Sequence, residues 1–134
     1  MLDSIRSSYN VGSIFRTSDG AMIEKLVACG YTPYPPKKEV LKTALGSQES
    51  VRWEYIENPV DAVNKYKEMG YKVCALEQTD KSREHYSLAK SDFPLCLIIG
   101  NEITGVKQEL IDLCDFSIEI PQYGIKQSLN VAVA

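Results

Sequence analysis

A short, unbroken apolar run near the end of the chain constrains its fold most strongly. Residues 95–99 are all apolar and are bounded by Pro94 and Gly100, and such a run predicts a strand that is buried on both faces. A helical pattern follows from Gly105, and a second strand is predicted at 116–120. Polar loops containing glycine follow both strands. The sequence therefore predicts two loops at the edge of a sheet where α/β proteins bind ligands.

The rest of the chain alternates strands with helices. A polar loop at 7–15 comes first and runs into a helix that ends near Gly20. Further strands are predicted at 25–29, 51–56 and 71–76. Further helices are predicted at 40–45 and from Pro59 to Gly70. This order predicts an α/β fold with a mainly parallel sheet flanked by helices. Because the 134 residues contain no internal repeat and no linker, a single domain over 1–134 is expected.

Composition narrows the classes of partner and cofactor. A net charge of −3 does not favour general nucleic-acid binding, so any RNA contact must be confined to one face, and DNA is not expected. No apolar run approaches the ~20 residues of a membrane helix, and no membrane partner is expected. Widely spaced cysteines in apolar segments match no metal site and predict buried, reduced thiols in a cytoplasmic protein; they are Cys29, Cys74, Cys96 and Cys114.

Three motifs follow one another along the chain. They are NVGSIFR at 10–16, IGNEITG at 99–105 and IPQYGIKQSLNV at 120–131. In this order and spacing they resemble the three motifs of the SpoU (TrmH-type) RNA ribose 2′-O-methyltransferases of the SPOUT superfamily. The segments KTALG at 42–46 and VRW at 51–53 are also similar to that family, so the resemblance covers nearly the whole chain.

The resemblance implies a fold, a cofactor and an assembly. The last third of the chain would form a deep trefoil knot, S-adenosyl-L-methionine would bind in the knot loops, and a homodimer would share its active sites between subunits. Matched position by position, the implied catalytic residues are Asn10, Arg16, Glu102, Ser128 and Asn130. Backbone groups that hold the cofactor in the family correspond to Leu76, Gly100, Ile120, Ser128 and Leu129.

The sequence departs from the family pattern in two places and at its ends. Gln122 stands where members usually have Met, and Ala132 stands where they often have Ser. We also expect the domain to be incomplete at both ends. No strand is predicted before the loop around Asn10. The chain stops at Ala134, although residues from Asn130 onward begin to indicate a helix, which in the family closes the cofactor pocket and builds much of the dimer interface.

The chemistry of methyl transfer explains why these residue types matter. A ribose hydroxyl is a weak nucleophile and must be nearly deprotonated, in line with the methyl group. The guanidinium of Arg16 would stabilise the developing oxyanion, but an arginine is not deprotonated in proteins and therefore is not expected to be the base. Asn10 is expected to orient Arg16 or the ribose, and Glu102 to position loop residues. Arg6 and Lys126 are weaker candidates for contact with RNA phosphates.

Simpler structural roles exist for several of these residues. Arg16 could be a solvated helix residue, Gly100 the end of a strand, Glu102 a complement to a helix dipole, and Asn130 a helix cap. Gly12 belongs to no GxGxxG fingerprint and no Walker motif is present, so a Rossmann-like nucleotide-binding module has little support.

The sequence therefore predicts S-adenosylmethionine-dependent methylation of a ribose 2′-hydroxyl in structured RNA. Transfer RNA is favoured because no separate RNA-binding domain is evident. Two alternatives stay open: the catalytic domain of a ribosomal RNA 2′-O-methyltransferase, and a knotted domain that binds RNA or cofactor without catalysis.

Overall fold

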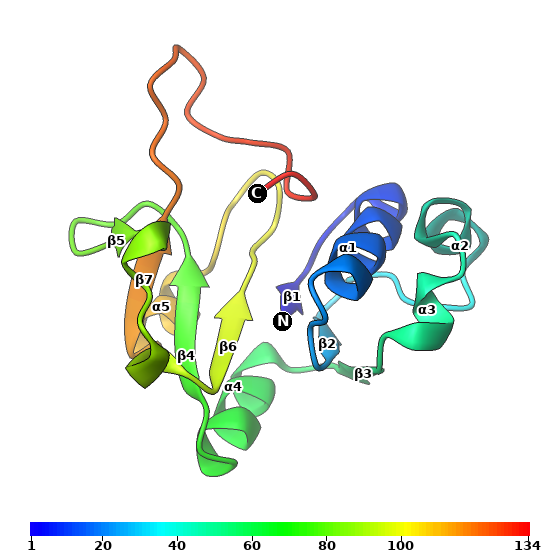
Figure 1. The fold of residues 1–134 in the computed structure, drawn as a ribbon, viewed down its shortest axis with the longest axis horizontal. Helices are drawn as coiled ribbons and strands as arrows, with labels where there is room; N and C mark the ends of the chain where they lie inside the picture. The colour runs from blue at the N-terminus through cyan, green and yellow to red at the C-terminus, as the bar shows by residue number, and fades with distance from the viewer.

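Seven short strands, each parallel to its neighbours, form the framework of the computed structural model, which describes residues 1–134 (Figure 1). One hydrogen-bonded set has the order β1 (Leu2–Asp3), β2 (Leu26–Cys29), β3 (Trp53–Ile56), and the other has the order β5 (Arg83–Glu84), β7 (Phe116–Glu119), β4 (Lys72–Leu76), β6 (Leu95–Ile98). The N–H of Asp3 donates to the carbonyl of Ile99, and the N–H of Ile99 donates to the carbonyl of Met1, both at 2.9 Å. These bonds join β6 to β1, so the two sets form one continuous parallel sheet.

Helices cover both faces of this sheet. They are α1 (Ser8–Gly20), α2 (Lys38–Ala44), α3 (Ser47–Ser50), α4 (Pro59–Glu68) and α5 (Gln108–Leu113), with two 3₁₀ turns, η1 (His85–Ser87) and η2 (Lys90–Asp92). The longest helix has 13 residues, and none of them could span a bilayer. The observed architecture confirms the predicted α/β fold with a parallel sheet flanked by helices.

Alternation along the strands divides the core into two layers. On β2, Val27 packs in a cluster with residues of α4 and α5, whereas Leu26 packs in a cluster with residues of α1 and α2. Successive side chains of a strand point to opposite faces. The first cluster therefore fills one face of the sheet beneath α4 and α5, and the second fills the other face beneath α1 and α2. Burial on both faces explains why β2 is apolar throughout.

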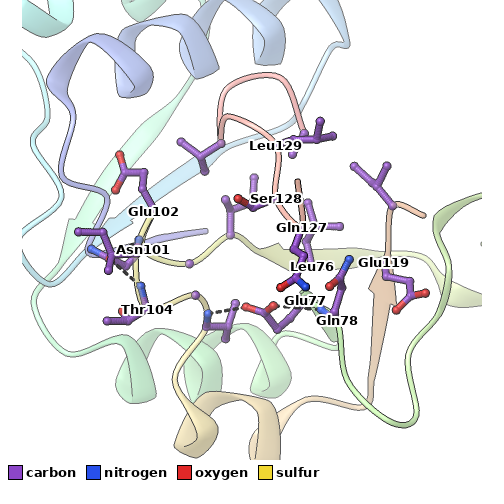
Figure 2. A pocket seen from close by; sticks show the side chains of 18 of the residues that line it. Leu76, Glu77, Gln78, Asn101, Glu102, Thr104, Glu119, Gln127, Ser128 and Leu129 are labelled. Atoms are coloured by element: carbon purple, nitrogen blue, oxygen red, sulfur yellow. Dashed lines mark hydrogen bonds between the residues drawn. The ribbon is translucent and has the colours of Figure 1, made fainter. Parts of the chain in front are cut away.

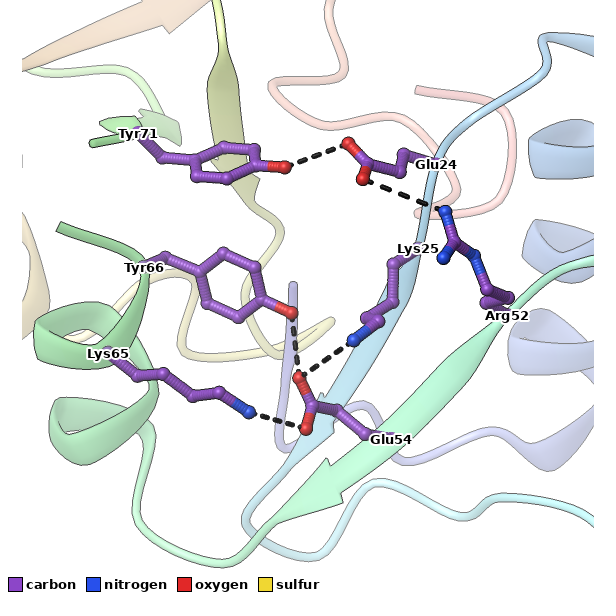
Figure 3. Close-up of polar contacts among 7 residues, drawn as sticks. All are labelled: Glu24, Lys25, Arg52, Glu54, Lys65, Tyr66 and Tyr71. Atoms are coloured by element: carbon purple, nitrogen blue, oxygen red, sulfur yellow. Dashed lines mark hydrogen bonds and ion pairs between the residues drawn. The ribbon is translucent and has the colours of Figure 1, made fainter. Parts of the chain in front are cut away.

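A group of polar side chains ties α4 to the β2–β3 edge (Figure 3). The carboxylate of Glu54 on β3 accepts hydrogen bonds from Lys65 Nζ and from the hydroxyl of Tyr66, both at 2.7 Å, and Lys25 Nζ lies 3.6 Å from it. Burial raises the pKa of Glu54, but the bonds from Lys65 and Tyr66 and the charge of Lys25 outweigh it, so this pKa is lowered. Glu54 is therefore held as a carboxylate between sheet and helix.

Three details of the sequence prediction are corrected by the structure. A strand does precede the Asn10 segment: β1 begins at Leu2, and two residues are too few to give a periodic signal. The expected loop at 7–15 is mostly helix, because α1 begins at Ser8 and the Ser7 hydroxyl caps it by accepting from the N–H of Asn10 at 3.3 Å. Gly105 lies in a turn with φ +67°, and α5 begins only at Gln108.

The cysteines have the predicted state. All four are free, three are buried and Cys114 is half-buried. Burial raises the pKa of Cys29 and of Cys74 to about 12 and that of Cys114 to about 11. Burial thus favours the protonated thiols of Cys29, Cys74 and Cys114 at neutral pH.

Candidate active site

Four segments meet at the carboxyl edge of the sheet and line an open cavity of about 390 Å³ (Figure 2). They are the end of β4 with Glu77 and Gln78, the loop at 99–106 after β6, the end of β7 with Ile120 and Gln122, and parts of the C-terminal segment from Gln127 onward. Figure 1 shows why the last segment takes part: it runs away from the sheet after β7 and returns beside the loop that follows β6. The predicted pair of loops at one edge is confirmed.

The loop after β6 is held in shape by the side chain of Asn101, which is buried. Its Nδ2 donates to the carbonyl of Ser4 at 2.8 Å and to the hydroxyl of Tyr31 at 2.7 Å. Its Oδ1 accepts from the N–H groups of Ile103 at 2.8 Å and Thr104 at 3.0 Å. Both donor positions and both acceptor positions of the amide are used, so Asn101 fixes this wall of the cavity.

The carboxylate of Glu77, directly after β4, braces the same loop. Glu77 accepts the N–H of Val106 at 3.0 Å with one oxygen and the N–H of Gln78 at 3.0 Å with the other. A Cβ added at Gly105 would overlap the carboxylate of Glu77, and one added at Gly100 would overlap the backbone of Gly105. Only glycine allows the loop to fold this tightly against β4.

All five residues expected to hold the cofactor line this cavity. They come from three strand ends and the C-terminal segment, and they are Leu76, Gly100, Ile120, Ser128 and Leu129. Residues far apart in sequence are thus brought to one place, although their roles in binding stay a prediction. In residues 1–134 no group of His, Cys, Asp and Glu side chains is arranged to hold a metal ion.

An adjoining hollow contains most of the residues expected to be catalytic. Its lining comprises Arg6, Ser7, Asn10, Glu102 and residues 128–131. Glu102, Ser128, Leu129 and Val131 line both the cavity and this hollow. A group bound in the first could therefore reach a group bound in the second across this shared wall.

Glu102 connects the loop after β6 to the start of α1. Its carboxylate accepts from the N–H of Arg6 at 2.8 Å, from the N–H of Ser7 at 3.1 Å and from Asn10 Nδ2 at 3.1 Å. Partial burial raises the pKa of Glu102, but these bonds, together with one from its own N–H, outweigh it and lower the pKa. A carboxylate with these partners and a lowered pKa is a poor proton acceptor, so the geometry favours a positioning role.

The remaining residues predicted for catalysis or phosphate contact do not all lie at the hollow. Asn130 Nδ2 lies 3.4 Å from Asn10 Oδ1, which closes the hollow from the C-terminal side. Arg16 is exposed on α1, lines neither space and makes no hydrogen bond or ion pair within the chain. Six residues advance a helix by about 9 Å and turn it by about 240°, so Arg16 points away from the hollow that Asn10 enters. Lys126 is exposed and lines neither space either.

The two departures from the family pattern differ in position. Gln122 lines the cavity, and its Nε2 donates to the carbonyl of Ile120 at 3.1 Å. Ala132 lies outside the cavity lining, and its N–H donates to Asn130 Oδ1 at 2.9 Å. Only the first departure therefore changes a group at the candidate cofactor site.

Gly12 in the first motif has a packing role. An added Cβ would overlap the carbonyl of Val40 and the hydroxyl of Thr43, and would lie 2.8 Å from the backbone nitrogen of Ala44. The Thr43 hydroxyl in turn donates to the carbonyl of Tyr9 at 2.8 Å. This glycine lets α1 and α2 approach closely, and it is not part of a phosphate-binding loop.

Sequence reasoning missed the positioning roles of Asn101 and Glu77. Asn101 stood inside the recognised second motif, but nothing local indicated its four partners. The bonds from Glu77 to Val106 and from Asn101 to Ser4 join residues 29 and 97 positions apart. A polar residue directly after a predicted strand was the only available signal.

Comparisons with known proteins agree with this geometry. Residues 1–134 match the model of the SpoU rRNA Methylase family. The chain is 34% identical over 137 residues to the tRNA (guanosine(18)-2′-O)-methyltransferase of Aquifex aeolicus, which covers 98% of this chain and 62% of that protein.

Two solved structures with bound cofactor are similar over nearly the whole chain. One is the AdoMet-bound rRNA methyltransferase of Sinorhizobium meliloti, with 29% identity and a TM-score of 0.90 over 98% of this chain and 50% of that one. The other is the SpoU methyltransferase AviRb of Streptomyces viridochromogenes in complex with AdoMet, with 25% identity and a TM-score of 0.86 over 99% and 51%. The chain thus spans between 50% and 62% of the length of these relatives.

Proposed function

Because this chain belongs to the SpoU rRNA methylase family, we propose that it transfers a methyl group from S-adenosyl-L-methionine to a ribose 2′-hydroxyl in structured RNA. The observation that carries the proposal is the junction of two spaces. A cavity lined by the five expected cofactor residues shares a wall with a hollow lined by Asn10, Glu102 and Asn130. A methyl donor and an acceptor hydroxyl need such adjacent sites.

The residues of the cavity fit this cofactor. Its volume, about 390 Å³, lies in the range of small-molecule sites. Three carboxylates line it, those of Glu77, Glu102 and Glu119, and no lysine or arginine does, which suits a ligand with a sulfonium and an ammonium group. Apolar side chains such as Leu76 and Ile120 offer surface for an adenine ring. When bound, the cofactor supplies an electrophilic methyl group.

Arg16 is proposed to act from a second copy of the chain. A guanidinium beside the ribose would stabilise the oxyanion that develops as the hydroxyl proton leaves to the neighbouring phosphate or to water, and it would also bind that phosphate. Arg16 faces away from the hollow of its own chain and has no partner there. A homodimer in which α1 of one protomer reaches the hollow of the other would use the same residue without rearranging the helix.

Asn10 and Glu102 are proposed to shape the hollow. Glu102 fixes the start of α1 through the N–H groups of Arg6 and Ser7. It also orients the amide of Asn10, whose oxygen faces Asn130. Held in this way, Asn10 and Asn130 can bond to ribose hydroxyls, and Ser128 lies at the wall shared with the cavity.

The finer features of the function are also proposals. The path of the C-terminal segment past the loop after β6 supports a deep trefoil knot (Figure 1). The free cysteines support a reducing, cytoplasmic location. Transfer RNA is the favoured substrate, supported by the Aquifex relative named for it. Ribosomal RNA is the alternative, supported by the name of the Sinorhizobium structure. Arg6 is the better placed candidate for phosphate contact, since Lys126 lies outside both spaces.

Transfer from tritiated S-adenosylmethionine to total RNA tests the proposal. We expect label in a nuclease-resistant 2′-O-methyl dinucleotide. Transfer RNA and ribosomal RNA are assayed as separate fractions, which shows which of the two is methylated. Arg16→Ala should abolish transfer and leave cofactor affinity nearly unchanged, whereas the neighbouring Thr17→Ala should retain activity. Cofactor binding without label in any RNA would favour a non-catalytic domain instead.

Mixed dimers test the origin of the arginine. Arg16→Ala chains keep the cavity, and Ser128→Trp chains keep the arginine but fill the cavity. If Arg16 acts across the dimer, an equal mixture should regain about a quarter of wild-type activity, since half of the dimers are mixed and each has one complete site. A mixture as inactive as either variant would place Arg16 in the site of its own chain.

A further inference from the structure

A separate hollow of about 550 Å³ is lined mainly by aromatic rings, backbone and one positive charge. Its residues are Gly30, Tyr31, Thr32, Pro33, Tyr34, Pro36, Lys37 and Tyr55. The three tyrosines remain 65%, 39% and 38% exposed in chain order. Lys37 is the only charged residue of the lining, and neither it nor Lys38 forms an ion pair within the chain.

The rings are already arranged as a tilted stack. The ring centre of Tyr34 lies 4.7 Å from that of Tyr55 and 5.6 Å from that of Trp53, with an angle of 32° between the planes in both pairs. The hydroxyl of Tyr55 donates to the carbonyl of Gly30 at 2.6 Å, which fixes this ring against the loop. The stack is thus preformed, and exposed aromatic surface of this kind commonly marks a binding site.

The hollow is joined to the cofactor cavity by one hydrogen bond. Tyr31, which follows the end of β2, accepts at its hydroxyl from Nδ2 of Asn101 at 2.7 Å. Asn101 lines the cavity. Because β2 and β6 are parallel strands of one sheet, the loops after them lie at the same edge. A molecule that spans this edge can therefore contact both the aromatic hollow and the methyl-transfer site.

We propose that the aromatic hollow binds an unpaired base of the RNA substrate, from a nucleotide close to the one that is methylated. This inference rests on the proposed function and adds to it a contact for the substrate. The base stacks on the exposed ring of Tyr31 or Tyr34, and Lys37 at the rim contacts the phosphate. Unpaired bases bind to aromatic side chains in this way, with positive charge following the backbone.

Binding of a short fluorescein-labelled single-stranded RNA to the 134-residue chain tests the proposal. Tyr34→Leu keeps apolar bulk against Trp53 but removes the stacking ring, and should weaken binding about tenfold with cofactor affinity unchanged. Lys37→Ala should reduce the slope of log affinity against log salt concentration by about one, which corresponds to the loss of one phosphate contact. The control is Tyr86→Leu, which removes a tyrosine outside the hollow that is 68% exposed, more than the 39% of Tyr34, and should bind RNA as the wild type does.

A second measurement of RNA binding uses the fluorescence of Trp53, the only tryptophan of the chain. Trp53 lies against Tyr34, so its fluorescence should change when RNA binds to the wild type, and Tyr34→Leu should need about tenfold more RNA for any change. If the wild type binds and methylates RNA while Tyr34→Leu binds it equally well, the hollow is not an RNA site and the proposed function stands. Equal loss in Tyr86→Leu would also overturn the inference. So would an altered sedimentation of Tyr34→Leu with unaltered RNA affinity, which would assign the hollow to a protein contact. If the wild type neither binds nor methylates RNA, the proposed function itself fails.

Discussion

Replacing Asn101 with alanine should weaken both the fold and the cofactor site. The substitution removes four hydrogen bonds. Three of the former partners belong to exposed residues and can form hydrogen bonds to water instead: the Tyr31 hydroxyl and the N–H groups of Ile103 and Thr104. The carbonyl of Ser4 belongs to a residue only 4% exposed and would lose its side-chain partner.

The size of the effect follows from these surroundings. A buried group left without its partner costs about 1–3 kcal/mol, and each bond exchanged for one to water costs about 0.5 kcal/mol, the lower end of the usual range. We therefore expect the free energy of unfolding to fall by about 3 kcal/mol for Asn101→Ala. Asn101→Asp keeps the acceptor for Ile103 and Thr104 but presents a carboxylate to the Ser4 carbonyl, so it should be at least as destabilising.

Urea unfolding followed by Trp53 fluorescence measures the loss of stability. Titration calorimetry with S-adenosylmethionine measures the loss of cofactor affinity. Because Asn101 shapes the loop that lines the cavity, cofactor affinity should fall along with stability. Asn64→Ala is the matched control, since Asn64 is exposed on α4 and alanine there should be neutral or stabilising by about 0.5 kcal/mol. A loss below about 0.5 kcal/mol in Asn101→Ala, with unchanged cofactor affinity, would refute the role given to this side chain.

Three further predictions use other contacts of the structure. Gly12→Ala should destabilise the protein by about 1–3 kcal/mol, because the added Cβ overlaps α2. The control Gly20→Ala should not destabilise it, since no atom lies within 4 Å of the added Cβ. Equal Tm values for the two variants would contradict the close approach of α1 and α2. Gln122→Met should bind the cofactor about 3- to 10-fold more tightly by calorimetry, because it frees the Ile120 carbonyl, and a similar gain in Gln127→Met would show that the bond is not the cause. The lowered pKa of Glu54 means that its contribution to stability is present above its ordinary pKa of 4.5 and is lost as the pH falls through the lower value of the folded state. Glu54→Gln should therefore show a shallower loss of unfolding free energy than the wild type between about pH 5 and pH 3, and parallel curves would contradict this.

Apolar patterning was enough to predict most of the sheet. β2 and β6 are short apolar runs and β4 is apolar after Lys72, so their positions followed from the apolar pattern, whereas β7 alternates apolar and polar residues. β1 has only two residues and no pattern could reveal it. The start of α1 was missed because one of its partners, Glu102, is 95 positions away from Ser7 in the sequence and reaches it only through the pairing at Leu2 and Ile99.

The site was less accessible to sequence reasoning than the fold. The five cofactor residues came from a resemblance between motifs, and only the tertiary structure brings them around one cavity. The roles of Asn101 and Glu77 depend on backbone groups supplied by distant segments. An asparagine or glutamate after a strand is common, and nothing in its neighbours distinguishes a residue that braces a loop from one that is solvated.

The position of α1 fits the proposal that one short motif serves two sites of a dimer. Asn10 lies at the beginning of the helix, where its amide bonds to Glu102 and faces Asn130 of the same chain. Arg16 lies six residues further on, which places it on another side of the helix, exposed and without a partner. A rigid helix cannot turn both residues into one hollow. The spacing of this motif is therefore better suited to a dimer, in which each α1 completes its own hollow at one end and that of its partner at the other.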